Sequence, residues 1–225
     1  MIALQGFGDQ IAAGAVTTLQ VALTSLVLGL GVGLGGAMAK LSRIAVLMRL
    51  ADAYTTIIRG VPELLIILIL YFGGTVALTA LVGRYVEVDA FAAGVFALTI
   101  VFGAYATEVF RAAIMAVPAS QIEAAHALGL SRGLTLRLVV LPQMWRHALP
   151  GLGNLWLTLL KDTALISVVG LEDLMRKSTV AAGSTHDPLT FYAIAAAIYL
   201  TFTSVSLVGL ALLERRAGRG VRTQA

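Results

Sequence analysis

Long apolar runs separated by short polar segments dominate the chain. A membrane-spanning helix needs about 20 mostly apolar residues, and five runs reach that length. They cover residues 11–38, 54–82, 90–113, 148–170 and 191–213. The first and last runs contain no charged residue, whereas each of the other three contains a few. The pattern predicts an all-α integral membrane protein with about five transmembrane helices.

Composition supports a membrane location. Of the 225 residues, 59% are hydrophobic and 12% are charged, whereas soluble domains carry about 25% charged residues. The chain has no cysteine and three scattered histidines, so we expect neither a disulfide nor a metal site. No nucleophile–base grouping is visible, which argues against a membrane-embedded enzyme with catalytic residues. In this setting the net charge of +4 predicts membrane orientation rather than a nucleic-acid partner.

The positions of Lys and Arg predict that orientation. If the C-terminus lies inside, five spans place the N-terminus outside, and only Arg84, Arg176 and Lys177 then fall in outer segments. Lys161 lies within a span. The inner cations are Lys40, Arg43, Arg49, Arg59, Arg111, Arg132, Arg137, Arg146, Arg215, Arg216, Arg219 and Arg222. Membrane proteins concentrate Lys and Arg on the cytoplasmic side, so we expect a cytoplasmic C-terminus.

The polar segment between the third and fourth runs is too long for a simple turn. Ser120 and Glu123 have the spacing of a capping box, which predicts a short helix starting here. Gly129 is expected to end that helix in the left-handed conformation. A second short helix should begin at Ser131 and stop before Pro142, because proline interrupts helices. The sequence therefore predicts a cytoplasmic helix–turn–helix, which is either an amphipathic surface linker or a docking element.

The same segment resembles the coupling loop of binding-protein-dependent ABC importers. The family pattern is E-A-A-x3-G-x9-I-x-L-P. The matching residues are Glu123, Ala124, Ala125, Gly129, Val139 (in place of the usual Ile), Leu141 and Pro142. Segments 59–64, 104–111, 160–163 and 213–216 also resemble polar amino acid permeases, in particular the Q-type subunits of histidine/lysine/arginine/ornithine importers and of octopine importers.

The resemblance implies a permease of a type I importer in the bacterial inner membrane. Its transmembrane domain would cover 15–213, between a periplasmic segment 1–14 and a cytoplasmic tail 214–225. The implied partners are a second permease (homologous or identical), two cytoplasmic ATPase subunits and a periplasmic binding protein. The implied ATPase contact comprises Glu123, Ala124, Ala125, Gly129, Leu141 and Pro142. The chain lacks a phosphate-binding G-x-x-x-x-G-K-[ST] loop, so ATP and Mg²⁺ should bind the ATPases and this chain should hold no cofactor.

Charged residues inside spans are costly in lipid and are therefore either paired or functional. Arg59 and Glu63 are one helical turn apart and can pair, as can Glu108 and Arg111. Asp162 lies within the fourth span and is a candidate for the substrate path, together with Glu63 and Glu108. In that role Asp162 would hold the cationic group of a basic amino acid, whereas the alternative is a helix–helix hydrogen bond.

Cargo and helix packing are less directly determined. The resemblance favours basic amino acids or opines, and other polar or neutral amino acids are the alternative. An ion-coupled secondary transporter would show an internal repeat, and none is visible. The first span contains two small-x-x-x-small pairs, Gly29/Gly33 and Gly31/Gly35. These pairs predict close helix packing within the subunit.

Overall fold

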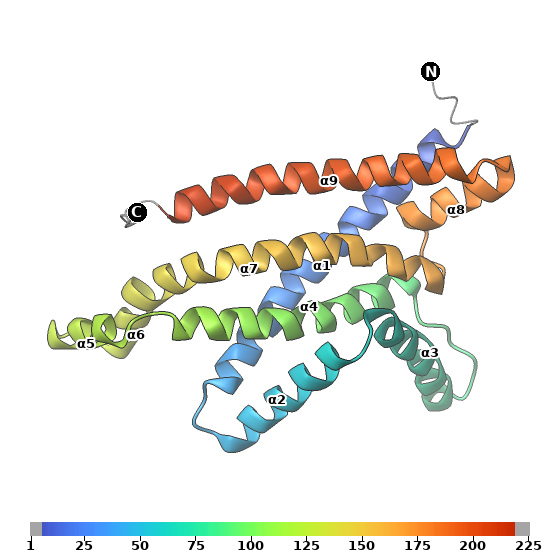
Figure 1. The fold of residues 1–225 in the computed structure, drawn as a ribbon. Helices are drawn as coiled ribbons and strands as arrows, with labels where there is room; N and C mark the ends of the chain where they lie inside the picture. Colours follow the sequence, from blue (N-terminus) through green and yellow to red (C-terminus); the bar gives the residue numbers. More distant parts are fainter. Residues whose placement is uncertain (1–5, 219–225) are drawn as a thin grey trace.

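The computed structural model describes residues 6–218, and no strand occurs within that range (Figure 1). The helices are α1 (Gly8–Lys40), α2 (Ala45–Gly60), α3 (Glu63–Val82), α4 (Ala90–Met115), α5 (Ala119–Ala127), α6 (Arg132–Thr135), a π-helical turn (Leu136–Val140), α7 (Leu141–Asp162), a 3₁₀ segment (Thr163–Val169), α8 (Leu174–Thr185) and α9 (Pro188–Ala217). Five helical segments are long and apolar enough to cross a membrane: α1, α3, α4, Arg132–Val169 and α9. The expected all-α fold with about five spans is confirmed.

The second predicted span is divided into two helices. α2 ends at Gly60 and α3 begins at Glu63, because Pro62 lacks an amide hydrogen and restricts the residue before it. That residue, Val61, is extended, with φ −112° and ψ 137°. Of the two helices only α3 qualifies as a span. The prediction of one continuous helix over 54–82 is therefore wrong.

The fourth span is longer than predicted. From Arg132 the chain runs through α6 and the π-helical turn directly into α7. Pro142 directly follows the π-helical turn, in a helical path that is continuous from α6 into α7. The prediction that the second short helix stops before Pro142 is therefore wrong.

α1 and α4 form the tightest helix pair. A Cβ added to Gly29 would lie 2.6 Å from the Phe102 ring, and one added to Gly33 would lie 2.6 Å from the Ala106 Cβ. Such close backbone approach supplies the packing between helices in lipid. An added Cβ on either glycine of the second predicted pair would have no neighbouring atom within 4 Å. The first pair therefore packs within the subunit, and the second does not.

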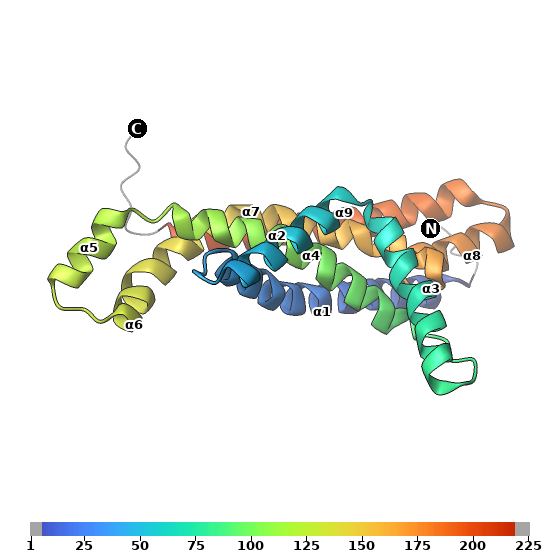
Figure 2. The ribbon, with the colours of Figure 1, turned by 90° about the horizontal axis from the view of Figure 1, so that it is seen from below.

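The bundle has two distinct ends. At one end lies the segment 116–140, which we call the hook, together with the end of α9 (Figures 1 and 2). At the other lie the start of α1 and the short helix α8, and the hydropathy pattern had not predicted α8. Of the predicted terminal segments 1–14 and 214–225, residues 1–5 and 219–225 lie outside the described residues. Residues 6–14 include the start of α1, and residues 214–218 include the end of α9.

Candidate functional site

The hook projects from the bundle as two short helical arms (Figure 2). α5 is preceded by Pro118, whose carbonyl oxygen accepts from the Gln121 amide at 3.1 Å. Ser120 thus lies inside the helix rather than at its cap, and the predicted capping box with Glu123 is wrong. Pro118 itself occupies the cap position, with φ −61° and ψ 132°, and no side chain there caps the helix.

The second half of the hook follows the prediction more closely. Gly129 has φ +78°, in the left-handed region, and its amide donates to the His126 carbonyl at 2.9 Å. This conformation ends α5, as expected for glycine after a helix. The Ser131 hydroxyl then accepts from the Leu134 amide at 3.4 Å and caps α6. Gln143 donates to the Gln121 side chain at 2.5 Å and ties the start of α7 to α5, a link that the sequence did not reveal.

The hook presents apolar side chains to its surroundings. Leu128 is 82% exposed and lies outside the five spanning segments, whereas Leu138, which is 59% exposed, lies within the segment Arg132–Val169. Leu128 is thus an apolar side chain that a partner protein could cover at the tip of the hook. Of the residues implied in ATPase contact, Glu123, Ala124, Gly129, Leu141 and Pro142 are exposed. Ala125 is 4% exposed and belongs to the internal packing of the hook.

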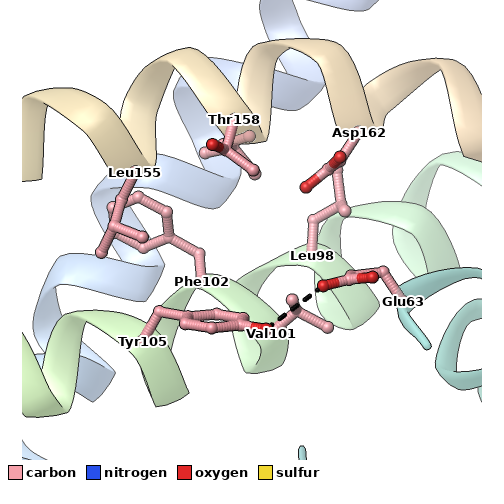
Figure 3. Close-up of a pocket in the computed structure, with 9 residues that line it drawn as sticks. Glu63, Leu98, Val101, Phe102, Tyr105, Leu155, Thr158 and Asp162 are labelled. Carbon is pink, nitrogen blue, oxygen red and sulfur yellow. Dashed lines mark hydrogen bonds between the residues drawn. The ribbon is translucent and has the colours of Figure 1, made fainter. Parts of the chain in front are cut away.

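A cavity of about 220 Å³ lies between the start of α3, the middle of α4 and the second half of α7 (Figure 3). Its lining residues are Glu63, Leu98, Val101, Phe102, Tyr105, Leu155, Thr158, Leu159 and Asp162. Glu63 enters as the first residue of α3 and Asp162 as the last residue of α7. Figure 3 shows both carboxyl groups on the same side of the cavity. Two acids that are 99 positions apart in the sequence therefore share one mostly apolar chamber.

Lys161 and Asp162 face different surroundings. Successive residues of an α-helix point about 100° apart, and Lys161 lines a separate groove with Tyr192 and Tyr199. Among residues 6–218, neither Asp162 nor Glu63 forms a salt bridge. No Lys or Arg among the described residues lines the cavity or forms a salt bridge with either acid.

Tyr105 connects Arg59 with Glu63. Its hydroxyl donates to the Glu63 carboxylate at 3.3 Å, and the Arg59 guanidinium lies 5.4 Å from its ring centroid. This distance is typical of a cation–π contact. The sequence predicts that Arg59 and Glu63 pair because one continuous helix would place them a turn apart. The helix is broken at Pro62, so the two residues lie on different helices and this reason does not hold. The aromatic residue between the two charges was missed because no sequence spacing links it to α2 or α3.

Glu108 lies in a charge network on the hook side of α4. It accepts from Lys40 at 2.5 Å and from the Arg111 guanidinium Nη2 at 2.8 Å. Lys40, at the end of α1, also contacts Asp52 of α2 at 2.8 Å. Glu108 does not line the cavity of Glu63 and Asp162, so its place differs from the predicted substrate path. Glu108 and Arg111 form an ion pair. Lys40 extends this pair to α1.

Comparison with known proteins identifies the class. Residues 31–219 match the family of binding-protein-dependent transport system inner membrane components. The chain belongs to this family. The permease is 49% identical to the nopaline transport system permease protein NocQ of Agrobacterium fabrum, over 97% of this chain and 95% of the relative. It is 45% identical to the histidine/lysine/arginine/ornithine transport system permease protein HisQ of Salmonella typhimurium, over 97% and 98%.

A solved structure supports the same class. The permease superposes on a chain of an amino acid ABC transporter with a TM-score of 0.84 and 34% sequence identity. The match covers 96% of this chain and 97% of that chain. The multi-pass helical architecture is therefore that of an ABC transporter permease, as the resemblance implied.

The end of the permease opposite the hook contains a buried acid. Asp173 caps α8, and its Oδ1 accepts from the Arg176 amide at 2.8 Å. Its other oxygen has no hydrogen-bond partner within residues 6–218. Burial raises the pKa of Asp173 to about 6, because removal from water disfavours the charged form. Nearby, the exposed Glu172 pairs with Lys177 at 2.7 Å, which lowers the pKa of Glu172.

Proposed function

We propose that the permease forms the translocation path of an ATP-driven importer for basic amino acids or opines. The observation that carries this proposal is the cavity with two carboxylates, Glu63 and Asp162, and no cation of its own. A charged carboxylate in apolar surroundings is costly unless a cation pairs with it. The ammonium or guanidinium group of a basic amino acid would supply that cation through charge-assisted hydrogen bonds. The cargoes printed in the names of NocQ and HisQ support this class.

The proposed orientation places the hook in the cytoplasm and α8 in the periplasm. Cations at or near the hook end support it, because cytoplasmic segments are rich in Lys and Arg. They are Lys40, Arg43, Arg111, Arg132, Arg137, Arg146, Arg215 and Arg216. The periplasmic end would then receive cargo from the binding protein. The N-terminus would be periplasmic and the C-terminus cytoplasmic, in the bacterial inner membrane.

The hook would receive the force of the ATPases. α4 leads into it and α7 leads out of it, and these two helices supply most of the cavity wall. A rigid movement of the hook would therefore shift two walls of the cavity together and alter access to Glu63 and Asp162. Two ATPase subunits would bind ATP and Mg²⁺, while this chain, without an ATPase site or cofactor, pairs with an identical or related permease.

Uptake into vesicles tests the proposal. The assembled transporter, reconstituted with its binding protein, is assayed for ATP-dependent uptake of labelled arginine and glutamine. Asp162→Asn and Glu63→Gln should each reduce arginine uptake at least tenfold, because a charge-assisted contact contributes about 1.5–3 kcal/mol. Glu214→Gln, an exposed change at the end of α9, is the matched control and should leave uptake unchanged.

The same assay separates the alternatives. Arginine uptake that survives both substitutions in a fully assembled complex contradicts a role for the cavity in cation binding. Robust wild-type uptake of glutamine but not arginine would instead assign a neutral polar cargo.

A further inference from the structure

A buried polar cluster lies at the end of the bundle opposite the hook. There α8 packs against α1, the 3₁₀ segment and α9, and each of these four elements contributes one oxygen-bearing side chain. The four residues are Thr18, Thr163, Asp173 and Tyr199. Thr18 and Asp173 are 0% exposed, and Thr163 is 1% exposed. Polar groups are costly to bury unless they have polar partners, so the partners of each oxygen matter.

Contacts between the elements hold the four side chains close together. The Thr18 hydroxyl accepts from the amide of Leu174, the residue that follows Asp173, at 3.1 Å. The Tyr199 hydroxyl lies beside the Thr18 and Thr163 side chains, and it is near enough to Asp173 to feel its charge. The cluster therefore gathers oxygens from four segments of the chain at one buried place.

Two oxygens of this cluster have no hydrogen-bond partner among residues 6–218. They are the Asp173 Oδ2 and the Tyr199 hydroxyl oxygen, and both are shielded from solvent. The Asp173 Oδ1 accepts from the Arg176 amide, but no salt bridge within the same range includes Asp173. The Thr163 hydroxyl donates to the Leu160 carbonyl at 2.8 Å, which leaves its oxygen free to accept. The cluster thus offers acceptor oxygens and one carboxylate without a matching cation.

An oxygen-only cluster with a single carboxylate suits a monovalent metal cation. Hard cations prefer oxygen ligands, and one carboxylate balances one positive charge. A divalent ion would leave a net positive charge buried, which is costly. A Cβ added to Gly14 would lie 2.8 Å from the Asp173 carbonyl oxygen, so α1 packs closely here and a small ion fits better than an organic cation.

We propose that this cluster binds a monovalent metal cation such as sodium. The Asp173 Oδ2 would supply the negative charge, and the hydroxyl oxygens of the other three residues would be neutral ligands. The ion would fasten α1, the 3₁₀ segment and α9 to the start of α8. The sequence predicts no metal site, because cysteine is absent and the histidines are scattered, whereas three of these ligands are hydroxyl groups. None of the four residues lines the cavity that carries the proposed function, so the two proposals stand separately.

Binding of radioactive sodium tests the site directly. The assembled transporter is equilibrated with labelled sodium at pH 8, and the bound ion is counted. The wild type should bind one sodium ion more per copy of this chain than Asp173→Asn, which keeps a capping oxygen but removes the charge. Asp187→Asn is the matched control, because Asp187 caps α9 at the same end through the Thr190 amide, and it should bind like the wild type. Absence of bound sodium from the wild type, or equal binding by Asp173→Asn, would overturn the proposal.

Thermal stability provides a second measurement. Exchange of N-methylglucamine for sodium at constant ionic strength keeps charge screening equal, so a higher thermal midpoint reports specific binding to the folded complex. We expect a rise of about 3 °C in the wild type. An identical midpoint in the two salts would overturn the proposal, because a proton or a buried water would then satisfy Asp173.

A tyrosine variant keeps the test open if Asp173→Asn does not assemble. Tyr199→Phe removes one ligand oxygen and should weaken sodium binding about fivefold. Tyr192→Phe is the matched control on the same helix, because Tyr192 is 39% exposed and lies outside the cluster. Equal sodium affinity of the Tyr199→Phe and Tyr192→Phe complexes would contradict the proposed ligand set. Since neither measurement needs transport, these outcomes are separate from any failure of arginine uptake.

Discussion

Lys40 donates to Glu108 at 2.5 Å and thereby joins the end of α1 to the part of α4 that leads into the hook. The Lys40 side chain is 8% exposed, so its charge depends on Glu108 and Asp52 rather than on water. Both acids lie on other helices. Lys40 thus fastens α1, α2 and α4 to one another near the hook.

Removal of Lys40 should weaken the assembled permease. Lys40→Met leaves the partly buried Glu108 with Arg111 alone, so the cost should stay below the about 3–5 kcal/mol of an uncompensated buried charge. We expect a lower thermal midpoint of the purified complex and a loss of transport. Combining Lys40→Met with Glu108→Gln should recover part of the stability. Arg43→Met, at an exposed position nearby, is the control, and an equal loss there would contradict a specific role for Lys40.

Tyr105 should position Glu63 for cargo. Tyr105→Phe removes the hydroxyl that donates to Glu63 and keeps the ring beside Arg59. A hydrogen bond to a charged group contributes about 1.5–3 kcal/mol, so arginine uptake should show a KM about tenfold higher. Tyr105→Leu, which also removes the ring, should cost more. If both variants transport like the wild type, Glu63 does not depend on this residue.

Gly129 should be required for its backbone conformation rather than for its size. An added Cβ would meet no atom within 4 Å, but φ is +78°, a region that costs other L-residues about 1–2 kcal/mol. Gly129→Val should distort the hook and uncouple ATP hydrolysis from uptake. Gly129→Asn should retain more activity, because asparagine tolerates this region. Gly133→Ala, at a helical and unobstructed glycine, is the control.

Gly33 should tolerate no larger side chain. An added Cβ would lie 2.6 Å from the Ala106 Cβ, so Gly33→Leu would force α1 away from α4. We expect little assembled complex in detergent extracts. Gly35→Leu changes the same helix by the same atoms but meets open space, so normal recovery is expected. Equal yields of the two variants would contradict close packing at Gly33.

The stability of the permease should depend on pH through Asp173. Its pKa is about 6 in the folded protein against 3.8 ordinarily, so the folded state holds the proton more tightly. Protonation therefore stabilises the fold at low pH, and this contribution is lost as pH rises from about 4 through 6. We expect a higher thermal midpoint at pH 5 than at pH 7. Asp173→Asn keeps a capping oxygen and should remove most of this difference, and an unchanged pH profile would contradict the assignment.

The sequence by itself determined the fold class, the family and most of the spans. Apolar length is a local property, and a motif of fixed spacing such as Glu123 to Pro142 can be read without coordinates. Local rules also placed Gly129 at the end of α5 and Ser131 at the cap of α6. They were wrong at Ser120, because the helix already begins after Pro118, and at Pro142, because the helical path continues through that residue. Pro62 broke a run that hydropathy alone had joined.

Only the tertiary structure decided which charged groups meet. Glu63 and Asp162 share a cavity, while Glu108 belongs instead to Lys40, 68 positions away. Whether side chains from different helices converge depends on the rotation and separation of those helices. These are set by contacts such as Gly33 against Ala106, in which a single Cβ matters. Hydropathy reports that a helix is buried in lipid, but it carries no information on which neighbour each face will touch.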